Sequence, residues 1–123
     1  MNNDLLQASI TPLFDYFNGL IPLNERERQL VIESFQPRLY RNKQYILQEG
    51  DICTKFNFVV RGCIRMYKID DKGYTHILQF TAENGWLTDL GSFHGKKVSK
   101  LNIDALEDTM VLQISYENLI ALY

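Results

Sequence analysis

The sequence predicts a mainly β chain, an all-β sandwich or jelly roll with helices at its two ends. From Pro37 onward, apolar residues alternate with polar ones at the period of two that is typical of strands. Turn sequences such as Glu49-Gly50-Asp51 and Asp70-Asp71-Lys72-Gly73 divide this region into seven or eight short strands. Before Pro37 the apolar spacing is helical instead.

Length and charge limit the function classes. The chain has 123 residues, of which 46% are hydrophobic, so we expect one domain. A net charge of −2 lacks the positive field that phosphate-backbone binding requires, so this chain alone is not predicted to bind nucleic acid. No apolar run approaches the roughly 20 residues of a membrane span, and the N-terminus carries Asp4 where a signal peptide would be basic. We expect a soluble, cytoplasmic protein that does not bind membranes.

The first third of the chain is predicted to be helical. Residues 4–19 carry a helical apolar stripe, with a helix restart at Thr11-Pro12. Asn24 and Glu27 have the spacing of a capping box, which predicts a helix from Glu25 to Ser34 that ends before Pro37. We therefore divide the domain, residues 1–123, into an N-terminal helical segment (1–35), a jelly roll or sandwich (36–114) and the start of a further helix (115–123).

The strand region begins with two short strands, residues 39–41 and 44–47. Further strands follow on both sides of Arg61-Gly62, and in the strand after the 70–73 turn we expect Tyr74, His76, Leu78 and Phe80 on one face and Thr75, Ile77 and Gln79 on the other. The last strand spans residues 109–114, and Ser115 is placed to cap a helix. That helix has no stop signal before Tyr123, so we expect the sequence to be part of a longer protein.

The stretch from Asn84 to Ala105 is the most distinctive. Trp86 follows a glycine, a short helix is predicted near Thr88-Asp89, and a strand returns with Leu101, Ile103 and Ala105 on one side. The first N–H groups of a helix lack internal partners and can bind an anion. This stretch therefore predicts a pocket for a small anionic ligand.

An ordered set of short motifs covers most of the chain. The set comprises Ile46, Glu49-Gly50-Asp51, Phe58-Val59-Val60-Arg61-Gly62, Ile64-Arg65-Met66-Tyr67, Gly85-Trp86, Asp89-Leu90 and Ala105-Leu106-Glu107-Asp108. With these motifs, residues 23–123 resemble the cyclic-nucleotide-binding domain of the Crp/Fnr transcription regulators. The resemblance implies a double-stranded β-helix, or jelly roll, that is not an enzyme but the effector sensor of a homodimeric bacterial regulator. It also implies that the last helix begins a dimerisation helix and that a helix-turn-helix DNA-binding domain follows beyond this chain.

The resemblance also assigns candidate ligand-binding residues. Members that bind cyclic AMP carry Gly-Glu-Leu at the helix start, where the Glu accepts from the ribose hydroxyl. Here Thr88, Asp89 and Leu90 stand there, and Asp89 can take that hydroxyl with a shorter side chain. Ser99 stands where the family has a phosphate-binding Arg, so a contact worth about 1.5–3 kcal/mol is missing. Lys100 can replace it only if the strand register shifts by one. The expected ligand is a cyclic nucleotide such as cAMP or another small anion.

Two other hypotheses remain open. The same fold can have a degenerate pocket and serve as a dimerisation or interaction module; side chains of Trp86, Leu90 and Leu101 filling the pocket would favour this. The other is a cupin-like metalloenzyme, although His76 and His94 lie too far apart for its His-x-His metal set.

Two other side-chain groups have open or default interpretations. Arg65 and Tyr67 share a strand face that either reaches a ligand or is external. Cys53 and Cys63 lack metal-ligand spacing, and we expect both to be reduced and buried.

Overall fold

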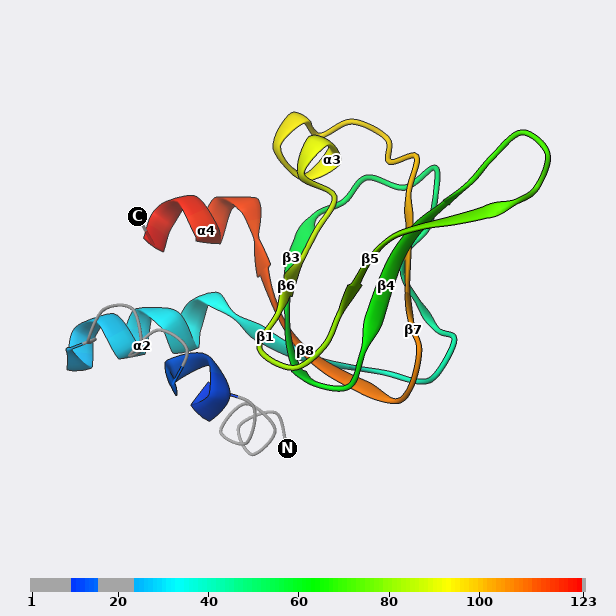
Figure 1. The fold of residues 1–123 in the computed structure, drawn as a ribbon. Helices are drawn as coiled ribbons and strands as arrows, with labels where there is room; N and C mark the ends of the chain where they lie inside the picture. Colours follow the sequence, from blue (N-terminus) through cyan, green and yellow to red (C-terminus); the bar gives the residue numbers. More distant parts are fainter. Residues whose placement is uncertain (1–9, 16–23, 123) are drawn as a thin grey trace.

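Eight strands form two four-stranded antiparallel sheets in the computed structural model of the chain, which describes residues 10–15 and 24–122. In spatial order, sheet A contains β1 (Gln36–Tyr40), β8 (Thr109–Ser115), β3 (Lys55–Arg61) and β6 (Trp86–Leu87). Sheet B contains β2 (Tyr45–Leu47), β7 (Asn102–Ala105), β4 (Ile64–Ile69) and β5 (Thr75–Thr81). The predicted jelly-roll fold class is confirmed (Figure 1).

The main core lies between the sheets. Successive residues of a strand point to opposite faces, so Val59 and Val111 of sheet A meet Ile64 and Ile103 of sheet B in one buried cluster. The neighbouring residue Phe58 points away from sheet B, into a second cluster beneath the helices. Sheet A is therefore apolar on both faces.

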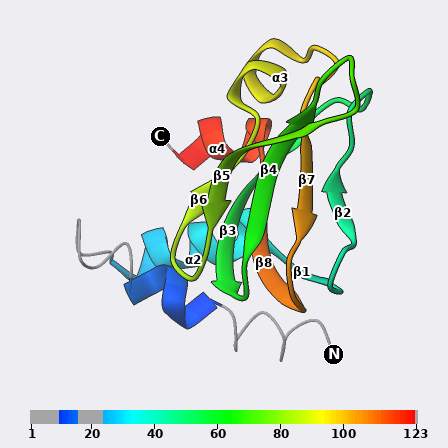
Figure 2. The ribbon, with the colours of Figure 1, turned by 45° about the vertical axis from the view of Figure 1, so that its right-hand side comes forward.

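Helices cover the outer face of sheet A. Residues 10–15 are helical, and α2 (Glu25–Ser34) and α4 (Tyr116–Leu122) lie on the same side of the molecule (Figures 1 and 2). The predicted capping box is present, because the Asn24 side chain accepts from the Glu27 N–H at 2.8 Å and the Glu27 carboxylate accepts from the Asn24 N–H at 3.0 Å. The rest of the predicted 4–19 helical segment lies outside the described residues. No helix in the described ranges is long and apolar enough to cross a membrane.

The predicted alternation in β5 is wrong. Met66 of β4 pairs with Gln79 and the next residue, Tyr67, pairs with Ile77, so Leu78 has no partner and forms a β-bulge. Beyond the bulge the faces exchange, so Ile77 lies on the same side as Phe80 and not with Gln79. A bulge depends on the partner strand, which the alternation within one strand does not report.

Candidate functional site

The segment between β6 and β7 contains the predicted ligand-binding residues. It includes the short helix α3 (Leu90–Gly95), which lies at one end of the sandwich next to α4 (Figures 1 and 2). Asp89 caps α3, and its Oδ1 accepts from the Ser92 N–H at 3.4 Å. A carboxylate of the protein itself therefore occupies the N-terminus of α3.

Asp89 also contacts Ser99, another of the predicted ligand-binding residues. The buried Ser99 hydroxyl donates to Asp89 Oδ2 at 2.5 Å and accepts from the Leu101 N–H at 3.0 Å. The structure thus brings together two of the predicted ligand-binding residues, one just before α3 and one shortly before β7. Their hydrogen bond joins the two ends of the α3 segment and satisfies both side chains.

The β2–β3 loop holds this segment from the other side. The Gly50 N–H donates to the Ser99 carbonyl at 2.9 Å, and the Ser99 N–H donates to the Asp51 carbonyl at 2.8 Å. The Cys53 N–H donates to Ser92 Oγ at 2.8 Å, and the buried Thr88 hydroxyl donates to the Lys55 carbonyl at 2.9 Å. Thr88 therefore also has a structural partner.

The remaining predicted residues face solvent. Leu90 is 56% exposed, and Lys100 is exposed. Trp86 does not fill the site, because its ring packs in the core under α2, with its centroid 4.9 Å from that of Phe58 and 6.0 Å from that of Phe35. Hydrogen bonds close the site, and neither Trp86 nor Leu90 fills it.

Two clefts lie beside the site. One of about 360 Å³ is lined by Asp51, Lys55 and Asn57 together with residues of β2 and β7, and another of about 240 Å³ lies between the β2–β3 loop, α3 and α4. Neither lining includes Thr88, Asp89, Leu90, Ser99 or Lys100.

The interior also contains a polar row that the sequence analysis missed. The buried Gln113 amide donates to Asn57 Oδ1 at 2.8 Å and to the Tyr40 hydroxyl at 3.0 Å, and the Asn57 amide donates to the Leu87 carbonyl at 3.2 Å. Asn57 lines the larger cleft. Its position among the apolar residues of β3 is the signal that could have identified it, because a buried amide needs hydrogen-bond partners.

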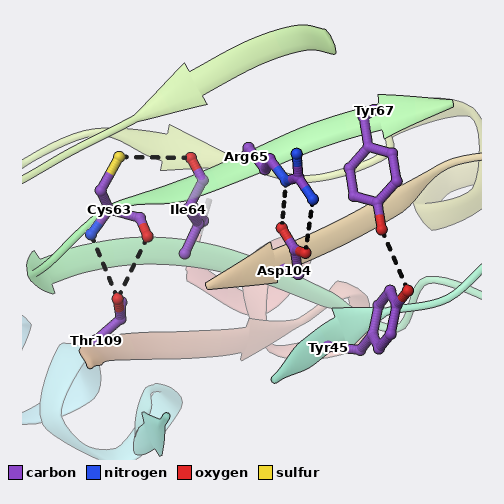
Figure 3. Close-up of polar contacts among 7 residues, drawn as sticks. All are labelled: Tyr45, Cys63, Ile64, Arg65, Tyr67, Asp104 and Thr109. Carbon is purple, nitrogen blue, oxygen red and sulfur yellow. Dashed lines mark hydrogen bonds and ion pairs between the residues drawn. The ribbon is translucent and has the colours of Figure 1, made fainter. Parts of the chain in front are cut away.

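Arg65 and Tyr67 lie on the outer face of sheet B, not in the core between the sheets. The Arg65 guanidinium makes two hydrogen bonds to Asp104 of β7, at 2.7 and 3.1 Å, and its Cζ lies 4.3 Å from the centre of the Tyr67 ring (Figure 3). The hydrogen bond with Asp104 raises the pKa of Arg65. The Tyr67 hydroxyl donates to Tyr45 Oη at 3.3 Å (Figure 3). This cluster joins three strands of the sheet.

Tyr67 is expected to make stability fall at alkaline pH. Burial, and then the hydrogen bond with Tyr45, raises the pKa of the Tyr67 phenol from 10.0 to about 12. Between these values the unfolded chain releases the proton and the native protein keeps it, so the free energy of unfolding decreases as pH rises. The expected decrease is about 1–3 kcal/mol, measured by urea unfolding from pH 9 to pH 12.

The matched variants are Tyr67→Phe and Tyr74→Phe. Tyr67→Phe should flatten this part of the profile, whereas Tyr74→Phe, which removes a phenol on a residue that is 66% exposed, should leave it unchanged. An unchanged slope in Tyr67→Phe would contradict the assignment to Tyr67.

Metal and thiol chemistry gain little support from the described residues. They contain no group of three or more His, Cys, Asp and Glu residues placed to hold a metal ion, and His76 contacts Asp70 at 2.8 Å instead. Both cysteines are free, but Cys63 is half-buried, so its predicted burial is wrong. Cys63 lies in the turn between β3 and β4. Burial, then Glu107 and Glu83, raises the Cys63 pKa, which is the opposite of what a reactive thiol requires.

Comparison with known proteins identifies the family. Residues 37–123 match the family model of the cyclic nucleotide-binding domain. The chain belongs to this family. Cyclic nucleotide-binding domains bind ligands and regulate, and they usually have no catalytic activity of their own. The Crp/Fnr resemblance predicted from the motifs is confirmed.

Solved structures of other cyclic nucleotide-binding domains have the same fold. The catabolite activator protein of Thermus thermophilus is 25% identical, with a TM-score of 0.72, and the match covers 87% of this chain and 48% of that one. The sensor domain of the transcriptional regulator DNR from Pseudomonas aeruginosa is 15% identical, with a TM-score of 0.76, and the match covers 95% and 77%. A search of curated proteins finds no sequence match.

A third similar structure contains a nucleoside. It is the regulatory subunit of a cAMP-independent protein kinase A from Trypanosoma cruzi bound to guanosine, 11% identical, with a TM-score of 0.75 and coverage of 98% and 42%. The chain thus spans about half or less of the Thermus and trypanosome proteins.

Asp89→Ala is expected to destabilise this cyclic nucleotide-binding domain by about 1–2 kcal/mol, because it removes the cap of α3 and the acceptor of the Ser99 hydroxyl. Asp89→Asn should lower the free energy of unfolding by less than half of that amount. Asparagine caps helices as well as aspartate, and the Ser99 hydroxyl can turn toward the Leu101 carbonyl, 3.3 Å away. Urea unfolding followed by circular dichroism measures both. Equal stability of Asp89→Ala and the wild type would mean that the carboxylate has no structural role.

Proposed function

We propose that the chain is the effector-sensing domain of a Crp/Fnr-like transcription regulator. A cyclic nucleotide or another small anion binds beside α3 and changes the position of α4, which signals to a helix-turn-helix DNA-binding domain beyond this chain. In the intact protein, α4 begins the helix that pairs two subunits. Residues 1–123 form one sensor domain in this proposal. The observation that carries it is the direct contact between α3 and α4.

The contact between α3 and α4 is aromatic and ionic. The Tyr116 ring at the start of α4 lies edge-on to Phe93 and His94 of α3, with centroids 5.6 and 5.4 Å apart. Next to them, Lys96 Nζ lies 3.8 Å from the Glu117 carboxylate. Phe93 is buried, so it cannot move without changing the packing of Tyr116. This geometry supports coupling between ligand binding at α3 and the position of α4.

The proposed ligand contacts are Thr88, Asp89, Leu90, Ser99 and Lys100. A ligand hydroxyl that binds the Asp89 carboxylate has to displace the Ser99 hydroxyl, which now lies 2.5 Å from Oδ2. Losing that hydrogen bond to a charged group costs about 1.5–3 kcal/mol, unless the ligand replaces it. The exposed Lys100 ammonium supplies positive charge next to Ser99, where the family has its arginine. Opening of the Asp89–Ser99 pair is thus the proposed first response to an effector.

A second candidate is the same domain without a small-molecule effector, acting as a dimerisation or interaction module. It is favoured by a specific observation: Thr88, Asp89 and Ser99 all have hydrogen-bond partners within the protein. In addition, the described residues leave no buried side-chain N or O atom without a partner. A ligand that binds these three side chains has to replace hydrogen bonds that the protein already makes, so its binding adds none.

Calorimetric and thermal-shift titrations with cyclic AMP, cyclic GMP and a panel of small anionic metabolites separate the two candidates. A ligand at 100 times its dissociation constant should add about 2.7 kcal/mol of stability. Sensing predicts binding that Asp89→Asn and Lys100→Gln weaken and that the control Lys72→Gln, in the β4–β5 turn, leaves unchanged. If no compound stabilises the protein, the second candidate is favoured. Binding that neither site variant weakens would place the ligand elsewhere.

A further inference from the structure

The four edge strands of the two sheets differ in how they are protected. Exposed edges have unpaired N–H and C=O groups that can pair with another chain, and proteins block them with short strands, prolines or charges. In the described sheets, β2 has three residues and β6 has two, and β1 contains Pro37 and Arg38. The fourth edge, β5, has seven residues and contains no Pro, Lys, Arg, Asp or Glu. Only its bulge at Leu78 interrupts it.

Three of the exposed side chains of β5 are large and apolar, and they lie among the exposed polar residues Thr75, His76 and Gln79. Ile77 is 45% exposed, Leu78 49% and Phe80 59%, and we call these three residues the β5 patch. Ile77 and Phe80 pair with Tyr67 and Arg65, so they extend the outer face of sheet B to its edge. The β4–β5 hairpin projects away from the helices (Figure 1). The turn end of the β5 edge therefore lies away from α2 and α4 (Figure 1).

We propose that β5 pairs antiparallel with β5 of a second copy of this chain, so that the two B sheets join into one continuous sheet. Antiparallel pairing of a strand with itself has two-fold symmetry, so each patch faces the same patch of its partner. Because β5 carries no Lys, Arg, Asp or Glu, the pairing brings no like carboxylates or ammonium groups together. Strand pairing satisfies the free backbone groups, and the two patches cover one another. This interface is distinct from the α4 pairing proposed above and needs no effector.

Sedimentation equilibrium of the 123-residue chain over a wide concentration range tests the pairing. We expect a reversible dimer, and the double substitution Ile77→Lys/Phe80→Lys should raise its dissociation constant by about tenfold or more, because it places four ammonium groups at the joint. Leu39→Lys is the matched control on the β1 edge, since Leu39 is 54% exposed. Ile120→Lys, on the 50% exposed Ile120 of α4, tests the other interface. Neither control should weaken the β5 dimer.

Hydrogen exchange of the wild type gives a second measurement that needs no variant. Amides of β5 should become more protected as the protein concentration rises, while those of β1 should not change. A chain that stays monomeric at all concentrations would overturn the proposal. So would a dimer that Ile120→Lys dissociates and Ile77→Lys/Phe80→Lys leaves intact, or β5 amides whose exchange is independent of concentration.

Discussion

Replacing Gly62 with alanine is expected to destabilise the protein by about 2–5 kcal/mol, as the sum of backbone strain and steric overlap. Gly62 has a φ of +109° between β3 and β4, a conformation that side chains rarely permit. A Cβ at this position would lie 2.8 Å from the Cα of Thr109. Thr109 is buried, and its hydroxyl donates to the Glu107 carbonyl at 2.8 Å, so β8 cannot move aside at low cost. Urea unfolding of Gly62→Ala measures the loss.

Gly73→Ala is the matched control, because it keeps the strain and removes the overlap. Gly73 has a φ of +87° in the β4–β5 turn, and a Cβ there would meet nothing within 4 Å. Its expected cost is about 1 kcal/mol. Similar losses in the two variants would show that the approach of Thr109 is not what makes Gly62→Ala costly.

The sequence predicts well those features whose causes are local. The signals for α2 lie within its own residues, the Asn24–Glu27 pair at its start and Pro37 just after its end, and the predicted bounds match the structure. The turn at Arg61-Gly62 is predicted for the same reason. The contact between Gly62 and Thr109 is not, because it depends on how β3, β4 and β8 pack.

Features that depend on a partner strand are predicted poorly. The faces of β5 exchange at Leu78 because β4 lacks a residue opposite it, and nothing in the β5 sequence reports this. The row of Asn57, Gln113 and Tyr40 is similar, since three polar groups from three strands satisfy one another only when the strands are in register.

In the candidate site, too, the local features were predicted and the contacts between distant residues were not. That a short helix begins near Thr88-Asp89 follows from local sequence, and the structure agrees. The hydrogen bond between Asp89 and Ser99 was not predicted, although both residues were singled out as ligand contacts. In the proposed site Ser99 takes the place of an arginine, and its hydroxyl binds the carboxylate that the proposed ligand would use.

Leu112→Ala is expected to destabilise the protein by about 2–5 kcal/mol, because it removes a fully buried side chain and leaves a cavity. Leu112 is 0% exposed and lies in the cluster that attaches the helices to sheet A, together with Leu13, Val31 and Phe58. Its neighbours come from residues 10–15, from α2 and from β3, and these elements cannot all close around the gap. The loss should therefore lie in the upper part of this range, measured by urea unfolding.

Leu39→Ala is the control for Leu112→Ala, since it makes the same change on the adjacent strand of the same sheet. Leu39 is 54% exposed, so its removal leaves no cavity and should change stability by about 0.5 kcal/mol or less. The helices are the part of the fold that this cluster holds, so Leu112→Ala should also increase hydrogen exchange in α2 more than in β7. If Leu112→Ala cost no more than Leu39→Ala, the helical layer would not depend on this cluster. Coupling between α3 and α4 would then have to act without a fixed helical layer beneath α4.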